Sequence, residues 1–505
     1  MGRIRPTLIL GGPGCGKTTA LLKIVEEAFS RGVKPDRVAF VAFTRKAAQE
    51  ARERMIEKFE IESDAIPYFR TLHSFAFAHL DIQRSQILSD DKLREYAQAE
   101  GMNLSKEFID EFGQAIPSPS TPDERALSAI SLSRLTGRSL DDTATEMDIG
   151  VDFARKIRDD YQEFKADAIL YDFTDMIELF GTKADVPSFD LLIVDEAQDL
   201  SKAQWRMVNK LAENAKDVYY AGDDDQAIYA WAGADIEYFL GLDADREVLP
   251  VSYRLKREVF DACQKVIRNC DERYPKNWEP HAEGGEVDFV TYLEDLDLSK
   301  GSWYMLARTN SLVRQFTKFL RDEGWAYWSP TKDGMRASTS VDPVKAVLVY
   351  ENLRQGKKFN GDQMRLCWNQ IRSTVRPDSM PSFDPLSEYD LDDLCSTGFD
   401  ASASWLEALS ISGRLQTYIR AMRARGESLV KPPRITASTI HGVKGGEADN
   451  VVVYQKLTSR TYRSWVDADP QEVRALFTAM SRARERLIFL EAKTAQNYSV
   501  ERMLL

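Results

Sequence analysis

Short hydrophobic runs, each bounded by turn-forming residues, recur along this chain. They are TLIL (7–10), RVAFVAF (37–43), LLIVDE (191–196), VYYAG (218–222) and VVVY (451–454). Segments with apolar residues at helical spacing lie between these runs, and this alternation is typical of parallel sheets with crossover helices. The pattern therefore predicts an α/β fold.

Two stretches interrupt the alternation. Residues 83–165 are polar and helical in character, and residues 356–431 are mixed in character. Each stretch is interpreted as an insertion into an α/β core. The length of 505 residues predicts three or four domains of ~100–200 residues each.

Composition and charge narrow the class of protein. The chain is 43% hydrophobic and 29% charged, with a net charge of -13 and a pI near 5.1. Such acidity argues against a surface coated with nucleic acid, but it leaves room for a local basic groove, because phosphate contacts act within ~8–10 Å. The five cysteines lack CxxC spacing, which favours reduced thiols in the cytoplasm over a zinc or iron–sulfur site. With no signal peptide and no apolar run near ~20 residues, we expect no membrane association.

The first strand runs into a glycine-rich loop, GGPGCGKT (11–18), which is followed by an amphipathic segment. This spacing predicts a phosphate loop, in which backbone N–H groups curl around phosphates, Lys17 reaches the terminal phosphates and the Thr18 hydroxyl binds Mg²⁺. The residues expected at the nucleotide are Gly11, Gly12, Pro13, Gly14, Cys15, Gly16, Lys17, Thr18 and Thr19.

A pair of carboxylates follows the apolar run 191–194. Asp195 and Glu196 stand at the carboxyl end of this predicted strand, which is where open α/β sheets bind ligands. Asp195 is predicted to hold Mg²⁺ through water, and Glu196 to act as the general base on the attacking water. Together with the phosphate loop, this pair predicts nucleoside triphosphate hydrolysis.

Further segments complete a series of motifs. They are VAFTRKAAQEARERM (41–55), RTLHSFAFAHL (70–80), LYDFTDMIEL (170–179), GDDDQAIYAWAGAD (222–235), LPVSYR (249–254), ITASTIHGVKGGEADNVVVY (435–454) and EVRALFTAMSRARERL (472–487). In this order, the series resembles the UvrD/Rep-like superfamily 1 DNA helicases over roughly two-thirds of the chain. The resemblance implies two RecA-like P-loop NTPase domains, each a parallel sheet flanked by helices and each with a mainly helical insertion.

The resemblance also implies roles at the nucleotide. Gln226 contacts the γ-phosphate or the attacking water, Arg254 and Arg482 clamp the γ-phosphate from the second motor domain, Tyr253 stacks on the base, and Glu447 reaches the ribose. The interpretation of Asp223, Asp224 and Asp225 stays open between capping the turn, supporting the metal and holding neighbouring basic residues.

Single-stranded DNA is the partner that the resemblance implies. Tyr229 and Trp231 face the DNA, and Trp231 stacks on a base, an interaction that tolerates any sequence. The matching DNA-side residues elsewhere are Phe43, Thr44, His73, Thr439 and His441. Outside the motifs, six basic residues between Arg414 and Arg434 are interpreted equally as a duplex contact or as a solvated helix face.

Four departures from the family pattern stand out. Only ten residues precede Gly11, so the usual adenine-reading segment has no counterpart, and Thr19 replaces the arginine that flanks the base in many relatives. Both changes predict loose nucleotide choice. Ala232 stands where an arginine is expected, which removes one expected contact with DNA. The second insertion is short, which predicts a reduced 2B accessory domain.

The resemblance divides the chain into motor domain 1A (1–82 and 166–255), insertion 1B (83–165), motor domain 2A (256–355 and 432–505) and insertion 2B (356–431). It implies a cytoplasmic enzyme of bacterial, archaeal or viral-in-host origin that uses ATP and Mg²⁺. The resemblance further implies that the enzyme acts as a monomer on single-stranded DNA and at single-strand/duplex junctions, and that it moves 3′→5′. Three alternatives remain open: a translocase that strips proteins without separating strands, a relative from the neighbouring branch that moves 5′→3′, and a nucleotide-switched scaffold with little turnover.

Overall fold

The structure is a computed structural model that describes residues 5–104, 121–182, 185–331, 334–376, 380–396, 398–399 and 402–504. Parts of both predicted insertions, including residues 105–120 and 377–379, lie outside these ranges. The chain forms two compact units. The first comprises Met1–Glu286, Arg463–Glu485 and Val500–Leu505, and the second comprises Val287–Tyr462 and Arg486–Ser499. The finer division into domains 1A, 1B, 2A and 2B stays a prediction.

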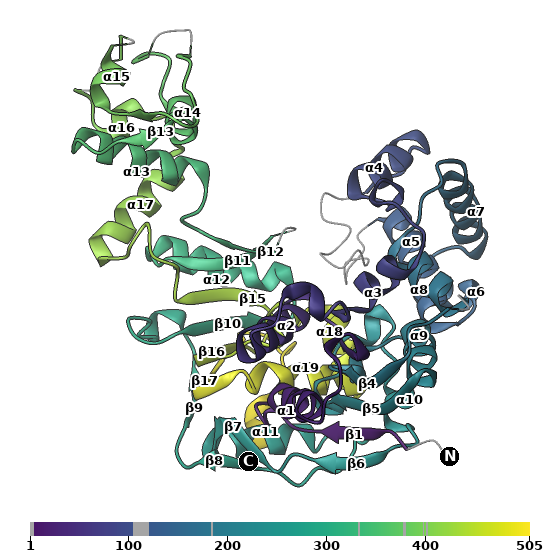
Figure 1. The fold of residues 1–505 in the computed structure, drawn as a ribbon. Helices are drawn as coiled ribbons and strands as arrows, with labels where there is room; N and C mark the ends of the chain where they lie inside the picture. Colours follow the sequence, from purple (N-terminus) through teal and green to yellow (C-terminus); the bar gives the residue numbers. More distant parts are fainter. Residues whose placement is uncertain are drawn as a thin grey trace. The chain divides into compact units, whose positions relative to one another are not determined.

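The first unit is built on a parallel sheet (Figure 1). Its strand order is β3-β2-β4-β5-β1-β6, and the neighbouring strands pair in parallel. The strands are β1 (Thr7–Leu10), β2 (Val38–Ala42), β3 (Phe69–Thr71), β4 (Phe189–Val194), β5 (Ala215–Gly222) and β6 (Asp245–Val248). The hydrophobic runs that predict strands thus coincide with β1, β2, β4 and β5, and the expected parallel sheet is confirmed.

Helices cover both faces of this sheet because its strand residues alternate between two cores. Ile9 and Phe40 pack with α1 and α2, whereas Leu8, Leu10 and Val41 pack with α3, α8 and α9. Outside the stretch predicted as the first insertion, the helices of this unit are α1 (Lys17–Ser30), α2 (Arg45–Phe59), α3 (Leu72–His79), α8 (Phe173–Thr182), α9 (Lys202–Glu213), α10 (Ile236–Leu240), α11 (Arg257–Ile267), α19 (Pro470–Met480) and α20 (Val500–Leu504). A separate two-stranded parallel pair joins β7 (Val251–Lys256) to β8 (Glu279–Ala282).

The stretch predicted as the first insertion is helical where it is described. It contains α4 (Asp90–Ala99), α5 (Pro122–Thr136), α6 (Leu140–Glu146) and α7 (Val151–Asp167). These helices bury a core of their own, which includes Leu93, Ile130 and Ile157. A local core allows this stretch to fold as an appendage without altering the sheet.

The second unit also contains a mostly parallel sheet, with strand order β12-β11-β15-β10-β16-β17-β9. β10 pairs in parallel with β15 and β16, and β11 pairs in parallel with β15 and antiparallel with β12. Its strands are β9 (Glu286–Val290), β10 (Trp303–Ala307), β11 (Tyr327–Thr331), β12 (Gly334–Ala337), β15 (Ile435–Thr439), β16 (Ala448–Tyr454) and β17 (Ala483–Leu490). The second predicted parallel sheet is therefore confirmed, with an antiparallel hairpin at one edge.

Small helices gather beyond the edge of this second sheet (Figure 1). The helices of the unit are α12 (Asn310–Asp322), α13 (Asp342–Arg354), α14 (Gly361–Gln370), α15 (Leu391–Cys395), α16 (Trp405–Ala408) and α17 (Gly413–Arg425), with a hairpin of β13 (Phe359–Asn360) and β14 (Glu388–Tyr389). The helix α18 (Ser459–Val466) begins in this unit, and its residues from Arg463 onward belong to the first unit. Trp368 and Met305 belong to one continuous core, so the helical part and the sheet are packed as one body.

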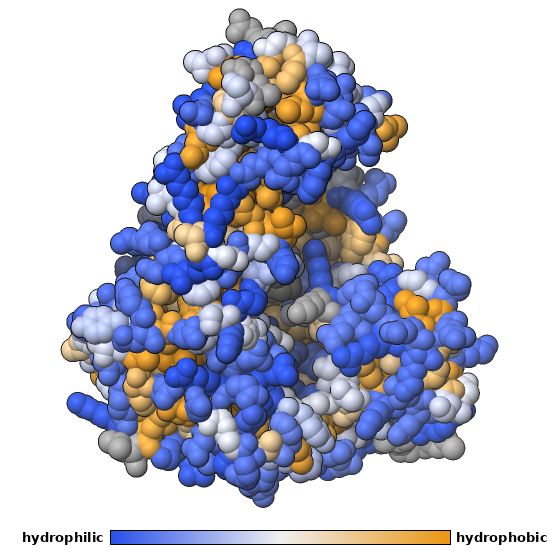
Figure 2. Space-filling model, turned by 90° about the vertical axis from the view of Figure 1, so that its left-hand side faces the viewer, coloured by the Kyte–Doolittle hydropathy of each residue, from blue (hydrophilic) through white to orange (hydrophobic). Residues whose placement is uncertain are grey.

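Hydrophilic residues dominate the face drawn in Figure 2, with smaller hydrophobic areas between them. In the part of the chain that the structure describes, every helix is too short or too polar to cross a lipid bilayer.

Candidate functional site

The predicted motifs of the first unit follow its strands at one edge of the sheet. Because all six strands run in the same direction, their carboxyl ends meet at that edge. In spatial order, the strands lead to His73 after β3, Phe43 after β2, Asp195 after β4, Gln226 after β5 and the phosphate loop after β1. The predicted nucleotide residues therefore lie after β4, β5 and β1, and the predicted DNA residues lie after β2 and β3.

The loop between β1 and α1 has the backbone that phosphate binding requires. Gly14 and Gly16 have φ of 73° and 75°, which residues with a Cβ rarely adopt. Gly16 precedes α1 and has no side chain to cap its first turn, so the amide end of α1 faces the loop. The Lys17 Nζ atom donates to the carbonyl oxygen of Gly11 at 2.8 Å, which holds the ammonium over the loop.

Next to the loop, Thr18 and Asp195 approach each other. Thr18 Oγ1 donates to Asp195 Oδ2 at 3.3 Å. Burial and the neighbouring Glu196 carboxylate raise the pKa of Asp195 to about 7, against the opposing effect of Lys17. Hydroxyl and carboxylate oxygens are ligands that Mg²⁺ prefers, and a cation would offset the charge that burial disfavours here. The residues present therefore fit the predicted metal.

Glu196 sits in a strained backbone conformation. Its φ of 54° is in the left-handed region, which is uncommon for a residue with a side chain and often marks a functional position. The residue begins the short helix η4 (Ala197–Asp199) directly after β4. A strained backbone at this position, next to Asp195 at the carboxyl end of β4, supports the prediction that Glu196 has a functional role.

Gln198 joins the acidic pair to the next strand, and the sequence reasoning missed it. Its buried amide donates from Nε2 to Glu196 Oε2 at 2.5 Å and to Asp199 Oδ2 at 3.1 Å. Its Oε1 accepts the backbone N–H of Asp223 at 3.1 Å. The sequence feature that could have identified Gln198 is its place among the acidic residues of DEAQD (195–199). A buried amide at that place needs hydrogen-bond partners, and the neighbouring carboxylates can provide them.

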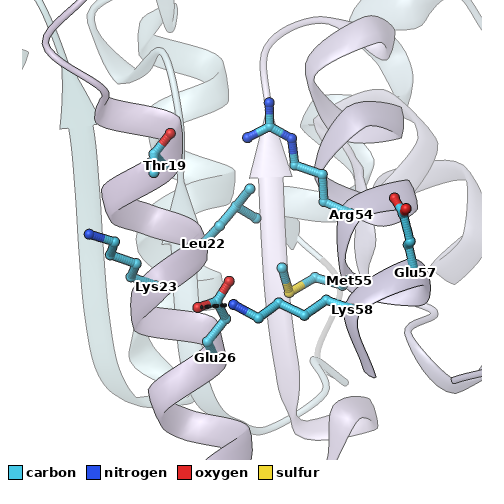
Figure 3. A pocket seen from close by; sticks show the side chains of 8 residues that line it. All are labelled: Thr19, Leu22, Lys23, Glu26, Arg54, Met55, Glu57 and Lys58. Carbon is cyan, nitrogen blue, oxygen red and sulfur yellow. Dashed lines mark ion pairs between the residues drawn. The ribbon is translucent and has the colours of Figure 1, made fainter. Parts of the chain in front are cut away.

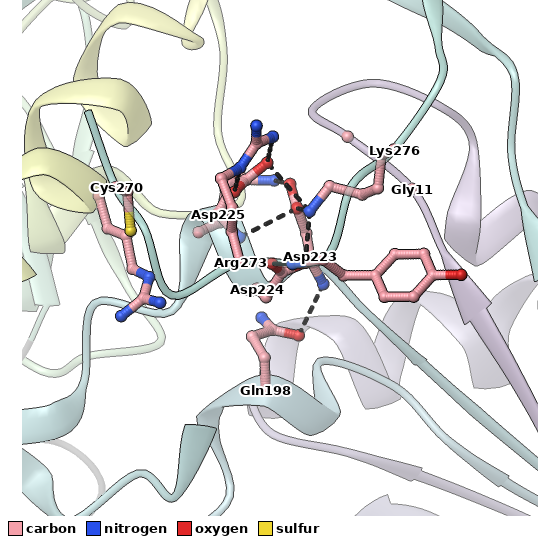
Figure 4. Close-up of polar contacts among 12 residues, drawn as sticks. Gly11, Gln198, Asp223, Asp224, Asp225, Cys270, Arg273 and Lys276 are labelled. Atoms are coloured by element: carbon pink, nitrogen blue, oxygen red, sulfur yellow. Dashed lines mark hydrogen bonds and ion pairs between the residues drawn. The ribbon is translucent and has the colours of Figure 1, made fainter. Parts of the chain in front are cut away.

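The three adjacent aspartates after β5 are fully buried rather than exposed to solvent, and Figure 4 shows them beside Lys276 and Arg273. Asp223 caps the short helix η5 (Asp224–Gln226) by accepting the N–H of Asp225 at 3.2 Å. The carboxylates also bind Lys276 and Arg273. Of the open interpretations, capping and the holding of basic residues are thus both observed for these side chains.

Both predicted arginines belong to the same compact unit as the phosphate loop. The buried guanidinium of Arg482 donates from Nη2 to Gln226 Oε1, while Gln226 Nε2 donates to Asp223 Oδ2 at 2.6 Å. Arg254 Nη1 donates to the carbonyl oxygen of Ser481 at 3.5 Å. Arg482 and Gln226 are therefore brought together, and Arg254 reaches the residue beside Arg482.

The β7 segment is fastened to the phosphate loop. Ser252 Oγ donates to the Pro13 carbonyl oxygen at 2.6 Å, and the N–H of Tyr253 donates to the Gly14 carbonyl oxygen at 2.9 Å. The Tyr253 side chain is 68% exposed, an unusual exposure for an aromatic ring. An exposed ring held beside the loop is available to stack on a base.

Three predicted DNA-side aromatics of the first unit form a row. The ring centroids of Phe43 and Tyr229 are 5.4 Å apart, and those of Tyr229 and Trp231 are 6.0 Å apart. Tyr229 and Trp231 are half-buried, so part of each side chain remains exposed, as a platform on which DNA bases stack would require. Thr44, by contrast, uses its hydroxyl oxygen to accept the N–H of Ala47 at 3.2 Å and cap α2.

His73 packs edge-on against Phe173, with ring centroids 5.4 Å apart. Burial and, to a smaller extent, the charge of Arg45 lower the pKa of His73 to about 4. The imidazole is therefore neutral at physiological pH and can contact a nucleic acid only by stacking or hydrogen bonding.

Three predicted residues belong to the second unit. Thr439 ends β15, and its Oγ1 accepts the N–H of Gly442 at 3.2 Å. His441 begins the short helix η8 (His441–Val443), and Glu447 is exposed just before β16. Their roles at the DNA and at the ribose stay predictions.

A cavity of about 510 Å³ lies between α1 and α2 of the first unit (Figure 3). It is lined by Thr19, Leu22, Lys23, Glu26, Arg54, Met55, Glu57 and Lys58. Lys58 Nζ and Glu26 Oε2 form an ion pair of 2.7 Å across it. Of the predicted nucleotide residues, only Thr19 lines this cavity, which is therefore distinct from the site around the phosphate loop.

The arginines near the end of the second insertion have acidic partners within the second unit. Arg423 binds both carboxylate oxygens of Glu351, at 2.9 and 2.5 Å, and Arg425 Nη2 lies 2.7 Å from Glu323 Oε2. Arg434 lies 3.5 Å from Glu427. These pairs favour the interpretation of a charged helix face over a basic surface that awaits DNA.

A phosphate loop between a parallel strand and a helix, with two carboxylates at the end of a nearby strand, defines the class of P-loop NTPases. Within this class, the UvrD/REP helicase N-terminal domain matches residues 4–247, and the UvrD-like helicase C-terminal domain matches residues 434–490. These matches cover more than half of the sequence. The chain belongs to the UvrD/Rep-like family of superfamily 1.

The chain is similar to several curated proteins named ATP-dependent DNA helicase PcrA. It is 30% identical to that of Leuconostoc citreum over 322 residues, covering 57% of this chain and 40% of the relative. It is 28% identical to that of Staphylococcus aureus over 309 residues, covering 58% of this chain and 42% of the relative. It is 27% identical to that of Bacillus subtilis over 408 residues, covering 75% of this chain and 52% of the relative. This chain therefore spans about half the length of the relatives it matches.

One solved structure, of the Arterivirus nonstructural protein 10 helicase, aligns with 99% of this chain and 61% of its own at 11% identity. The TM-score of 0.35 is too low to identify the fold, which the strand order of the two sheets defines by itself.

Proposed function

We propose that this protein is an ATP-dependent DNA helicase that translocates along single-stranded DNA in the 3′→5′ direction and unwinds duplex DNA. The observation that carries the proposal is the turn at residues 222–231. One end of this turn holds Gln226, which is bonded to Asp223 and Arg482, and the other end holds Tyr229 and Trp231 in the aromatic row. A single short segment thus touches both the nucleotide residues and the proposed DNA platform.

In the proposed reaction, Lys17 and the amides of the phosphate loop bind the phosphates of ATP. Thr18 and Asp195 would hold Mg²⁺, which when bound neutralises charge on the phosphate oxygens. Glu196 accepts a proton from the attacking water, and Gln226 orients that water or the γ-phosphate. Arg254 and Arg482 stabilise the negative charge that develops in phosphoryl transfer.

The proposed motion follows from the bonds around Gln226. Loss of the γ-phosphate changes what the Gln226 amide and the Arg482 guanidinium contact, and the turn carries this change to Tyr229 and Trp231, three and five residues further on. We also propose, on the family resemblance, that hydrolysis is coupled to the closing and opening of the two motor domains. Single-strand/duplex junctions, a monomeric state and a cytoplasmic location are parts of the same proposal.

Unwinding of two matched duplexes tests the proposal. One duplex carries a 3′ single-stranded tail and the other a 5′ tail, and Glu196→Gln serves as the control variant. The proposal predicts that wild-type protein with ATP separates only the 3′-tailed duplex and that Glu196→Gln separates neither. Separation of only the 5′-tailed duplex would contradict the direction.

Two alternatives give different results in the same assay. A translocase without strand separation would hydrolyse ATP in the presence of DNA and leave both duplexes intact. A nucleotide-switched scaffold would bind DNA without turnover, and wild type and Glu196→Gln would then behave alike. Turnover is favoured by the intact set of predicted hydrolytic residues, which are Lys17, Asp195, Glu196, Gln226, Arg254 and Arg482.

A further inference from the structure

A segment outside the predicted motifs, residues 273–281, lies against three of them. It follows α11 and leads into β8, which pairs in parallel with β7 and places Ser252 opposite Pro280. On the way, Trp278 packs against Gly12 so closely that a Cβ on that glycine would lie 2.6 Å from the indole ring. We call residues 273–281 the strap.

Lys276 is the centre of the strap's contacts (Figure 4). Its ammonium, with no exposed side-chain surface, lies 3.0 Å from Asp223 Oδ1 and 2.9 Å from Asp225 Oδ2, and it also bonds to Asp224 Oδ1. An ammonium has three N–H donors, and here three carboxylates from consecutive residues surround it. This arrangement fixes all three side chains of the turn relative to one point.

The charges of this cluster are mutually dependent. Burial alone would lower the pKa of Lys276, but the three aspartates raise it well above its usual value. Burial likewise would raise the pKa of Asp223, but Lys276 and Lys17 lower it. Lys276 is therefore a permanent cation, and Asp223 a permanent anion, inside the protein.

Two further bonds attach the strap to the same turn. Arg273 donates from Nε and Nη2 to the two oxygens of Asp225, at 2.8 and 2.7 Å. The backbone N–H of Tyr274 donates to Asp224 Oδ2 at 2.7 Å. Bidentate pairing of this kind fixes orientation as well as distance, so the strap constrains Asp224 and Asp225 from a second side.

The constraint reaches Gln226 directly. Gln226 follows Asp225 in the chain, and its Nε2 donates to Asp223 Oδ2 at 2.6 Å. Since Lys276 binds the other oxygen of Asp223, the carboxylate has both of its oxygens engaged and holds the Gln226 amide in one orientation. In that orientation, Gln226 presents Oε1 to Arg482.

We propose that Lys276 is a positioning residue for ATP hydrolysis, which acts through the three-aspartate turn to orient Gln226. This inference rests on the proposed function and names a determinant of its turnover step. It also accounts for three adjacent carboxylates beside a nucleotide site: together they form the cage of one buried cation.

Steady-state ATP hydrolysis with Mg²⁺ and a dT oligonucleotide tests the proposal on four proteins: wild type, Lys276→Met, Gln226→Ala and the double variant. Because an oriented polar group contributes roughly 10²-fold or more to such a step, Lys276→Met is expected to lower kcat by about 10- to 100-fold. The KM for ATP should change little, since the phosphate loop is intact. In the Gln226→Ala background, Lys276→Met should cause no further loss in kcat.

Lys165→Met is the matched control. Lys165 is also a buried lysine of the first unit, and its Nζ lies 2.6 Å from both Asp172 and Asp175. Its replacement removes a cation from a carboxylate cluster away from the phosphate loop, so it should lower stability and leave kcat unchanged. If Lys276→Met does not yield folded protein, Arg273→Gln replaces it, with a smaller expected loss in kcat and the same non-additivity with Gln226→Ala.

Two results would overturn the inference while leaving the proposed function intact. One is a folded Lys276→Met (or Arg273→Gln) variant whose kcat equals that of wild type or of Lys165→Met. The other is a double variant whose losses multiply, which would show that Lys276 does not act through Gln226. Absence of ATP hydrolysis by wild type itself would instead overturn the proposed function, and the inference with it.

Discussion

The side-chain Oε1 of Gln198 accepts the backbone N–H of Asp223 at 3.1 Å. The same amide donates to Glu196, so one buried side chain joins the acidic pair after β4 to the turn after β5. Gly222 leaves room for it, since a Cβ at that position would lie 2.5 Å from Gln198 Oε1. Glu196 and Gln226 are thereby held in one continuous hydrogen-bonded network.

Replacement of Gln198 by leucine should therefore lower kcat for ATP hydrolysis. The change keeps the volume but leaves Glu196 and the Asp223 N–H without this partner, and the expected loss is about 10- to 100-fold. Gln204→Leu is the control, because Gln204 is also buried but only caps α9. It should reduce the free energy of unfolding by about 1 kcal/mol without changing kcat. Equal kcat values for the two variants would contradict the network's role.

Replacement of Trp231 or Tyr229 by alanine should weaken binding to single-stranded DNA. Stacking of a base on an aromatic ring contributes ~1–3 kcal/mol, so each variant should raise the Kd for a dT oligonucleotide about 5- to 150-fold. Fluorescence anisotropy measures this Kd. Phe153, which is 38% exposed on α7, provides the control, and Phe153→Ala should bind as wild type does. Unchanged affinity in Trp231→Ala would show that its ring serves the fold alone.

His73 makes a prediction about pH. Its folded pKa, about 4, lies below the ordinary value of ~6.5 for an unfolded chain, so the unfolded state binds more protons between these values. Its contribution to stability is therefore complete above pH ~6.5 and is lost as the pH falls towards 4. Between pH 7 and pH 5, wild type should lose roughly 1–2 kcal/mol more of its free energy of unfolding than His73→Gln does. Urea unfolding at both pH values measures the difference, and parallel losses would contradict the assigned pKa.

Nucleotide choice should be loose. Tyr253 offers a ring to the base, and stacking does not distinguish purines, whereas hydrogen bonds to the base edge would. Thr19 lines the cavity between α1 and α2 and cannot replace the arginine that flanks the base in many relatives. The values of kcat/KM for ATP and GTP should agree within about tenfold, and Tyr253→Ala should lower both. A preference for ATP of a thousandfold would show that another residue reads adenine.

Local sequence patterns predicted the parts of the fold and site that depend on neighbouring residues. The strand at 7–10, the phosphate loop and the acidic strand end are each contained in a few consecutive residues, so spacing and hydropathy suffice to find them. The buried state of Asp223, Asp224 and Asp225 could not be found this way. It depends on Lys276, which lies 52 residues from Asp224 along the chain in a segment with no glycine-rich or acidic signature.

The same distinction between neighbouring and distant residues applies to the roles that were predicted only by the family resemblance. Gln226 and Arg482 are 256 residues apart and yet in contact, a pairing that the motif order implied but that no local pattern contains. Thr44 shows the reverse, since a threonine before a helical segment also predicts an N-cap, and the structure shows that cap. The basic stretch near Arg423 has its acidic partners far away in the sequence, so composition alone could not tell a binding surface from a paired one.

The most direct test of the central claim, that one turn couples nucleotide chemistry to DNA contact, is the rate of ATP hydrolysis with and without a dT oligonucleotide. The account predicts that DNA stimulates wild-type kcat at least tenfold and that Glu196→Gln, which retains the carbonyl oxygen but cannot accept the proton, loses about 10²–10⁴-fold of this activity while still binding DNA. A wild-type rate that DNA does not change, or that Glu196→Gln retains, would contradict the claim.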